Sequence, residues 1–288
     1  MKTNKMKKSE VSSTTYTERI VAFIDILGFK KLVERSLHSP EVAERIHRAL
    51  QLIYKRKQDN EATDFMGMQK YGVEVAVFSD SVVISYPLDY DGGLFFVLLD
   101  IIHLQLELMS LGILIRGGIA IGPLYHSGQI VYGPAMNQAY LLESVYAVYP
   151  RIILDEQTAV NGTIETCAWG HTVQMEAEYI DSCIRKDEDG FYYLDILRQD
   201  SELSDYGDEY YYWLKTVRKI IVRGLNDNMT DKRIYKKYVW LKKYFNEVVS
   251  DKEAFYPTPE TGKQGIRFRK AYMNLRIKRR RSGEIYYR

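Results

Sequence analysis

The chain has 288 residues, of which 46% are hydrophobic and 27% charged, a composition typical of a globular protein with one catalytic domain and a smaller appendage. Its 40 Lys and Arg residues nearly balance 38 Asp and Glu residues, and a net charge of +2 argues against a surface shaped overall for nucleic acid or membrane. The two cysteines, Cys167 and Cys183, lack zinc-ligand spacing, so we expect a reduced, cytoplasmic protein. Asp100 and Glu107 interrupt the apolar stretch 94–114, and we expect no signal peptide and no membrane-spanning helix.

The first predicted element is a buried strand that ends at an acidic residue. Residues 1–17 are polar and are expected to form a disordered leader. Residues 19–24 form a short apolar run typical of a central strand, and Asp25 follows it directly. The next predicted elements are two helices and a polar loop, over residues 28–36, 39–56 and 58–68.

Two β-branched runs around a second acidic residue predict a hairpin. They span residues 73–78 and 82–86, and Asp80 lies in the polar turn between them. An apolar helix over residues 94–111 then leads into a strand over residues 113–121. The order βαββαβ is the split βαβ, or ferredoxin-like, arrangement, an antiparallel sheet with helices packed on one face. We therefore predict an α+β fold.

The remainder of the chain predicts further elements around this core. A helix over residues 133–146 and a strand over residues 151–154 come first. Later strands are expected at residues 175–180 and 191–196, and an α-hairpin rich in Tyr and Trp at residues 208–226 and 232–250. We divide the chain into the leader, a catalytic domain over residues 18–197, a helical hairpin appendage over 198–256 and a basic tail over 257–288.

Asp25 and Asp80 are the strongest candidates for a functional site. In a split βαβ sheet the first strand and the central hairpin are neighbours, so both carboxylates can converge on one edge. Divalent ions that serve phosphoryl and nucleotidyl transfer take carboxylate oxygens as ligands. The alternative is that Asp25 caps the following helix and that Asp80 only favours a turn.

Four segments, in order, resemble motifs of the class III adenylate and guanylate cyclases. They are FIDILGF at residues 23–29, FSDS at 78–81, RGGIAIG at 116–122 and YGPAMNQA at 132–139. The resemblance covers about residues 19–154. It implies two divalent ions, Mn²⁺ or Mg²⁺, held by Asp25, Asp80 and the backbone carbonyl of Ile26, and it implies a contact from Asn137 to the ribose or the reacting phosphorus.

Several positions depart from the purine-specific members of that family. Ser79 stands where they usually have glycine. Ala76 and Ile130 occupy the positions of the residues that read the purine base, although Glu74 remains nearby. Leu141 stands where they carry the transition-state arginine. ATP and GTP are therefore less favoured as substrates.

The chain resembles most closely the pyrimidine cyclases of bacterial Pycsar antiphage defence systems, which share the FIDILGF start and the departure from purine recognition. This resemblance implies conversion of UTP or CTP into the 3′,5′-cyclic monophosphate and pyrophosphate. It further implies a head-to-tail homodimer with composite sites, and a separately encoded effector that the product activates. The second protomer is expected to bring Asn137, and with it Arg116, across the sheet face that carries Asp25.

Arg116 is our first candidate for the missing cation and Arg151 the second, because a planar guanidinium can bind developing phosphate charge bidentately. For each arginine a structural ion pair remains the alternative. Two other functions also stay open. The protein could be an inactive cyclase-like nucleotide sensor, or it could bind nucleic acid through the basic residues 267–281, although we favour a solvated tail there.

Overall fold

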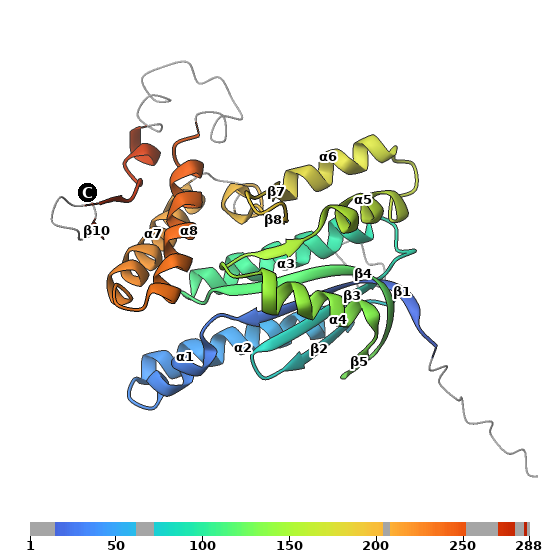
Figure 1. The fold of residues 1–288 in the computed structure, drawn as a ribbon, viewed down its shortest axis with the longest axis horizontal. Coiled ribbons are helices and arrows are strands. Elements are labelled where there is room, and N and C mark those ends of the chain that lie inside the picture. Colours follow the sequence, from blue (N-terminus) through green and yellow to red (C-terminus); the bar gives the residue numbers. More distant parts are fainter. Residues whose placement is uncertain (1–14, 62–71, 204–207, 252–269, 280–284, 287–288) are drawn as a thin grey trace, which may run out of the picture.

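The computed structural model describes residues 15–61, 72–203, 208–251, 270–279 and 285–286 (Figure 1). The first half of the chain contains β1 (Thr17–Ile26), α1 (Phe29–Ser36), α2 (Pro40–Glu61), β2 (Glu74–Phe78), β3 (Ser81–Pro87), α3 (Gly93–Ser110) and β4 (Ile115–Ser127). The second half contains β5 (Ile130–Tyr132), α4 (Pro134–Leu141), a π-helical turn (Leu142–Tyr146), β6 (Ile152–Leu154), α5 (Glu156–Glu165), α6 (Val173–Cys183), β7 (Ile184–Lys186), β8 (Tyr192–Leu194), a 3₁₀ turn (Ile196–Arg198), α7 (Asp208–Asp227), α8 (Lys232–Val248), β9 (Lys278–Arg279) and β10 (Ile285–Tyr286).

One mixed sheet organises these elements. Its strand order is β2-β3-β1-β4-β6-β8-β7, and β5 pairs with β4. Strand β1 lies between β3 and β4 and is antiparallel to both, as the ferredoxin-like arrangement requires. Strand β6 continues the sheet parallel to β4. The predicted α+β fold with a βαββαβ core is confirmed, and β6, β8 and β7 extend it.

The side chains of β1 alternate between two hydrophobic clusters. Ala22 and Ile24 belong to the main core, which includes residues of α2 and α3. Val21 and Phe23 belong to a smaller cluster with Ala135 of α4 on the opposite face. The expectation of helices on one face only was therefore wrong, because α4 covers part of the second face.

A strand and a loop are among the predicted elements that differ from the structure. The strand expected at residues 175–180 is instead part of α6, where Thr172 caps the helix by accepting a hydrogen bond from the Met175 N–H at 3.2 Å. Glu176, Ile180 and Cys183 form its buried face at helical spacing. The polar segment expected to be a loop from residue 58 continues α2 as far as Glu61.

The helices α7 and α8 form the predicted hairpin, which stands at one end of the sheet (Figure 1). Their buried side chains, among them Trp213, Leu225 and Phe245, belong to the same hydrophobic cluster as the sheet. A Cβ on Gly224 would lie 2.1 Å from the Tyr238 ring, so glycine permits the close approach of the two helices. The leader residues 1–14 and most of the basic tail lie outside the described residues.

Helix α3 is, within the part of the chain that the structure describes, the one helix long and apolar enough to cross a membrane. In that stretch 61% of the helix is buried inside the protein, including Leu94, Val97 and Leu98. We therefore interpret α3 as the central core helix beneath the sheet.

Gly118 on β4 is expected to be intolerant of any side chain. A Cβ there would lie 2.4 Å from Leu142 Cβ and 2.5 Å from the Ala139 carbonyl oxygen, so the junction of α4 with the π-helical turn would have to move. We predict that Gly118→Ala lowers the free energy of unfolding by about 1–3 kcal/mol, the usual cost of overpacking. Chemical denaturation measures this, and an unchanged midpoint would contradict the proposed packing.

Candidate active site

Asp25 and Asp80 meet at one end of the sheet, as the sequence predicts. Asp25 is opposite Ser81 on β3 and Arg116 on β4. The Ile26 N–H donates to the Asp80 carbonyl oxygen at 3.1 Å, which fixes the β2–β3 turn against the end of β1. The Ser81 hydroxyl donates to the Asp25 carboxylate at 3.4 Å. Because Asp25 follows Phe23 by two positions, its side chain is on the face of the sheet that α4 covers.

The turn that carries Asp80 has an unusual backbone. Ser79 has φ of 54°, in the left-handed region that costs a non-glycine residue roughly 1–2 kcal/mol. The resemblance noted above expects glycine at this position. The turn therefore keeps the geometry that glycine permits, although its sequence differs.

Arg116 connects Asp25 to a second buried carboxylate. Its Nε is 3.6 Å from an Asp25 carboxylate oxygen, and its Nη2 is 2.6 Å from a Glu143 carboxylate oxygen. Glu143 is in the π-helical turn and is buried. The absence of a side chain on Gly118 lets this turn approach β4 closely enough for the ion pair. Arg116 thus lies beside Asp25 of its own chain, and the expectation that a partner protomer brings it was wrong.

The carboxylates of Asp25 and Glu143 are negatively charged groups in a partly desolvated environment. Burial, and then the charge of Asp80, raise the pKa of Asp25, while Arg116 and Ser81 act in the opposite direction. Burial also raises the pKa of Glu143, and Arg116 again opposes it. The site therefore holds more negative charge than Arg116 alone stabilises.

This charge balance suits a bound cation. Asp25 and Asp80 are hard oxygen donors that would hold a divalent ion, and the Ile26 carbonyl is the backbone donor that the family resemblance implies between them. Among the described residues no group of three or more His, Cys, Asp and Glu side chains could hold a metal ion. Two carboxylates leave coordination positions for the oxygens of a substrate, as catalytic Mg²⁺ sites do.

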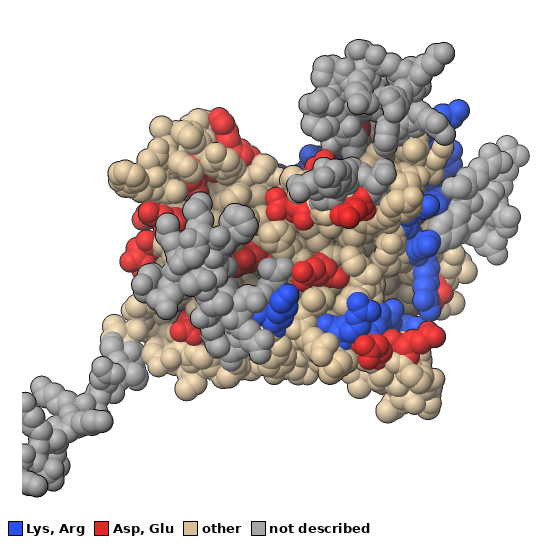
Figure 2. All heavy atoms as spheres, turned by 180° about the vertical axis from the view of Figure 1, so that it is seen from behind, with Lys and Arg blue, Asp and Glu red and all other residues tan. Residues whose placement is uncertain are grey.

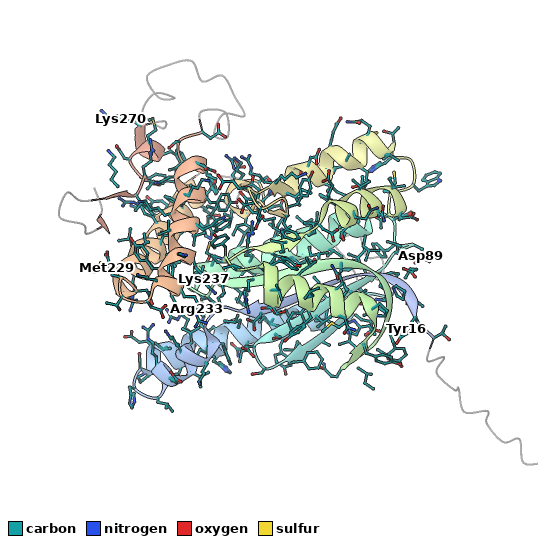
Figure 3. All side chains as sticks on the ribbon, viewed as in Figure 1. Tyr16, Asp89, Met229, Arg233, Lys237 and Lys270 are labelled. Atoms are coloured by element: carbon teal, nitrogen blue, oxygen red, sulfur yellow. The ribbon has the colours of Figure 1, made fainter. Side chains whose placement is uncertain are left out.

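Helix α8 places a lysine next to this site. The carboxylates of Asp25 and Glu143 raise the pKa of Lys237, but burial, followed by the charges of Arg116 and Arg233, lowers it overall. Lys237 is half-buried, and no hydrogen bond or ion pair to it occurs among the residues that the structure describes. Figure 3 shows Lys237 and Arg233 on the part of α8 beside the sheet.

Contacts on either side of Lys237 hold α8 in position. At its N-terminus, Asp231 forms an ion pair with Lys31 of α1 at 3.4 Å. One turn beyond Lys237, the Trp240 indole N–H donates to the Asp187 carboxylate at 2.9 Å. The Trp240 contact is the firmer of the two, because the Lys31–Asp231 pair is exposed and contributes little.

Asn137 is exposed on α4. In the described part of the chain, no hydrogen bond or ion pair joins its side chain to Asp25 or Asp80. Its role as a contact to the substrate stays a prediction.

Arg151 has a different environment from Arg116. It is 1% exposed and forms ion pairs with Asp187 and Asp189 in the β7–β8 turn. Its guanidinium also lies 5.3 Å from the Tyr149 ring centre and 5.6 Å from that of Trp240. These partners account for the arginine structurally, so we keep Arg116 and do not retain Arg151 as a catalytic candidate.

The sequence did not indicate Glu143 or Lys237. Glu143 is in the predicted helix 133–146, where a charged residue usually faces solvent. Lys237 is one of many basic residues in α8, and its position depends on how the hairpin docks. Glu143 is the buried partner of Arg116, and Lys237 lies within electrostatic range of Asp25 and Glu143. Both relations join residues distant in sequence, so only the folded chain shows them.

No protein-family model matches the sequence, and no curated protein matches it. Several solved structures align with part of the chain. The adenylyl cyclase CyaB from P. aeruginosa is 17% identical over 62% of this chain and 94% of its own, with a TM-score of 0.43. A bacterial light-regulated adenylyl cyclase is 17% identical over 71% of this chain and 56% of its own, with a TM-score of 0.36. A class III adenylyl cyclase-like ATP-binding protein from Pseudomonas aeruginosa is 15% identical over 79% of this chain and 44% of its own, with a TM-score of 0.31. At these identities the likeness concerns the fold alone.

Arg151→Ala is expected to destabilise the protein strongly. It removes charge-assisted hydrogen bonds to Asp187 and Asp189, whose carboxylates are partly exposed, and we expect a loss of about 1.5–3 kcal/mol. Denaturant titration measures the loss. A variant that unfolds within about 1 kcal/mol of the parent but has lost activity would instead restore Arg151 as a catalytic candidate.

Proposed function

We propose that the protein is a nucleotidyl cyclase that converts UTP or CTP into the 3′,5′-cyclic monophosphate and pyrophosphate with Mn²⁺ or Mg²⁺. The observation that carries the proposal is the convergence of Asp25 and Asp80 at the end of β1, with Arg116 beside them. Two neighbouring carboxylates can hold divalent metal ions, and the nearby arginine can stabilise phosphate charge. The site therefore suits a metal-bound nucleoside triphosphate.

The surroundings of the predicted base-reading positions support a pyrimidine substrate. Ala76 is buried in β2 and offers no polar group, and Ile130 is exposed on β5. Glu74 accepts a hydrogen bond from the Gly128 N–H at 2.9 Å, so its carboxylate already has a partner in the β4–β5 turn. The side chains that would read a purine edge are therefore missing or engaged.

The chain's own residues divide the catalytic work. When bound, two divalent ions supply charge neutralisation and acidify the ribose 3′-hydroxyl. Asp25 and Asp80 hold the ions, and Arg116 stabilises the charge that develops on the α-phosphate as the bond to pyrophosphate breaks. Lys237 contacts the leaving pyrophosphate, because it is a half-buried cation within electrostatic range of Asp25 and Glu143.

The proposed active species is a homodimer in which Asn137 comes from the second protomer. The segment from α4 to β6 exposes several large apolar side chains, namely Tyr140, Leu141, Val145, Tyr146 and Val148. A patch of this kind on the face that carries Asp25 suits a protein partner. A two-fold pair would form two equivalent composite sites.

The biological setting follows from the family resemblance alone. We propose a cytoplasmic second-messenger synthase in antiviral defence, whose product activates a separate effector. An inactive nucleotide sensor is the alternative, and it would bind triphosphate without turnover.

Incubation of the protein with each of the four ribonucleoside triphosphates and Mn²⁺ or Mg²⁺ tests the reaction. We expect cyclic UMP or cyclic CMP with release of pyrophosphate, and at least about 10³-fold lower rates for Asp25→Ala and Asp80→Ala. Circular dichroism confirms that both variants fold. Preferential cyclisation of ATP or GTP would overturn the pyrimidine assignment, and full activity in both variants would remove the metal site.

Lys237→Met tests the contribution of α8. We expect kcat/KM to fall by about 10–100-fold, the effect of losing one charge-assisted hydrogen bond to phosphate. The matched control is Lys236→Met, because Lys236 is the exposed neighbour on the same helix. Equal activity of the two variants would show that Lys237 does not touch the substrate.

Mixing Asp25→Ala protein with Asn137→Ala protein tests the composite site. Each variant is expected to be inactive alone, and a mixed dimer contains one intact site and one site with both lesions. Activity should therefore return to roughly a quarter of the parent value after random exchange of subunits. Exchange without recovery, or an active monomer in sedimentation, would contradict the homodimer.

A further inference from the structure

A basic hollow lies away from the carboxylates, between the end of α1, the start of α2 and α7. Its volume is about 290 Å³, close to the lower limit of ordinary small-molecule pockets. Arg35, Arg45 and Arg223 line it from three different helices, together with His38 and Ser39. Figure 2 shows Lys and Arg side chains gathered at one margin of the back face.

Arg45 is the central residue of this hollow. Its Nε is buried and has no hydrogen-bond partner in the described part of the chain. Burial, and then the charges of Arg35 and Arg223, lower its pKa. A partly buried guanidinium without a counter-charge is unfavourable, because its buried Nε is neither hydrated nor paired.

The acidic groups nearby do not neutralise the three arginines. Glu41 also lines the hollow but is exposed at its rim. Arg223 forms an ion pair with Asp227 at 3.4 Å, and both side chains are more than half exposed, so this pair contributes little. Among the residues that the structure describes, Arg35 and Arg45 form no ion pair. The hollow therefore keeps a local excess of positive charge.

The start of α2 adds to this preference for an anion. Ser39 and Pro40 begin a helix of 22 residues, and its first turn faces the hollow through Ser39 and Val42. The helix dipole favours negative charge at this end, while Pro40 has no N–H and the Val42 N–H already donates to Ser39. Three guanidinium groups and a hydroxyl are therefore the donors that the hollow offers a phosphate.

We propose that this hollow is a binding site for a small phosphorylated molecule, distinct from the candidate active site. The charge excess, the unpaired buried Nε of Arg45 and the small volume together define the ligand as a phosphate oxyanion with a small appended group. The bound phosphate would accept hydrogen bonds from Arg45 and offset the repulsion among the three arginines.

Binding of a ligand in the hollow would also affect the candidate active site. Tyr238 on α8 lies within electrostatic range of Arg35, Arg45 and Arg223, and it directly follows Lys237. A ligand that bridges α1, α2 and α7 would therefore hold α8 and fix Lys237 beside Asp25. This regulatory consequence rests on the proposed function, whereas the binding site itself does not.

The test measures binding without catalysis. Full-length Asp25→Ala protein, in EDTA and at constant ionic strength in chloride, is titrated with inorganic phosphate, pyrophosphate or UMP while its melting temperature is recorded. We expect a saturable rise of a few degrees with at least one of these probes. Arg45→Met should weaken the apparent affinity at least tenfold. The matched control Arg48→Met, on the exposed side of the same helix, should leave it unchanged.

Arg223→Met provides a second variant, because the exposed Arg223 side chain can be replaced without loss of fold. If Arg45→Met does not fold, the affinity of the Arg223→Met variant tests the binding site. Absence of a saturable rise would overturn the site. So would equal affinity in the Arg45, Arg223 and Arg48 variants. Since no turnover enters the measurement, failure of the cyclase assay leaves this result intact, and failure here leaves the cyclase proposal intact.

Discussion

The ion pair between Arg116 and Asp25 is the contact on which the rest of the site depends. Asp25 is partly buried next to Asp80, an arrangement that is unfavourable without positive charge. Arg116 supplies that charge, and its other end is held by the buried Glu143. Each group is thus placed by its neighbour of opposite charge. A divalent ion and a triphosphate would enter a site whose charges are already ordered.

Backbone features allow these charges to meet. The left-handed Ser79 turns the β2–β3 loop toward β1, and the missing side chain of Gly118 lets the π-helical turn approach β4. A π-helical turn is rare and is often found at functional sites. Here it places Glu143 on the inner side of the segment that the sequence predicts as one regular helix.

The sequence predicted the parts of the fold that local pattern determines. The apolar run before Asp25 and the β-branched runs around Asp80 read directly as strands, and their order gave the ferredoxin-like core and the pairing of the two acids. Residues 175–180 were misread as a strand because apolar and acidic residues alternate there, in the order MEAEY, while burial of Glu176 and Ile180 reveals a helical spacing. Glu143 and Lys237 were missed since their roles arise from contacts distant in sequence.

The helical hairpin is part of the site's construction as well as an appendage in sequence. Arg151 pairs with Asp187, and Asp187 in turn accepts a hydrogen bond from Trp240 of α8. Asp231 at the start of the same helix pairs with Lys31 of α1, the helix that follows Asp25. Lys237 lies between these two contacts. The buried Arg151 therefore helps to position the helix that carries Lys237, and its own ion pairs give it a structural environment although it lies at the same end of the sheet as Arg116.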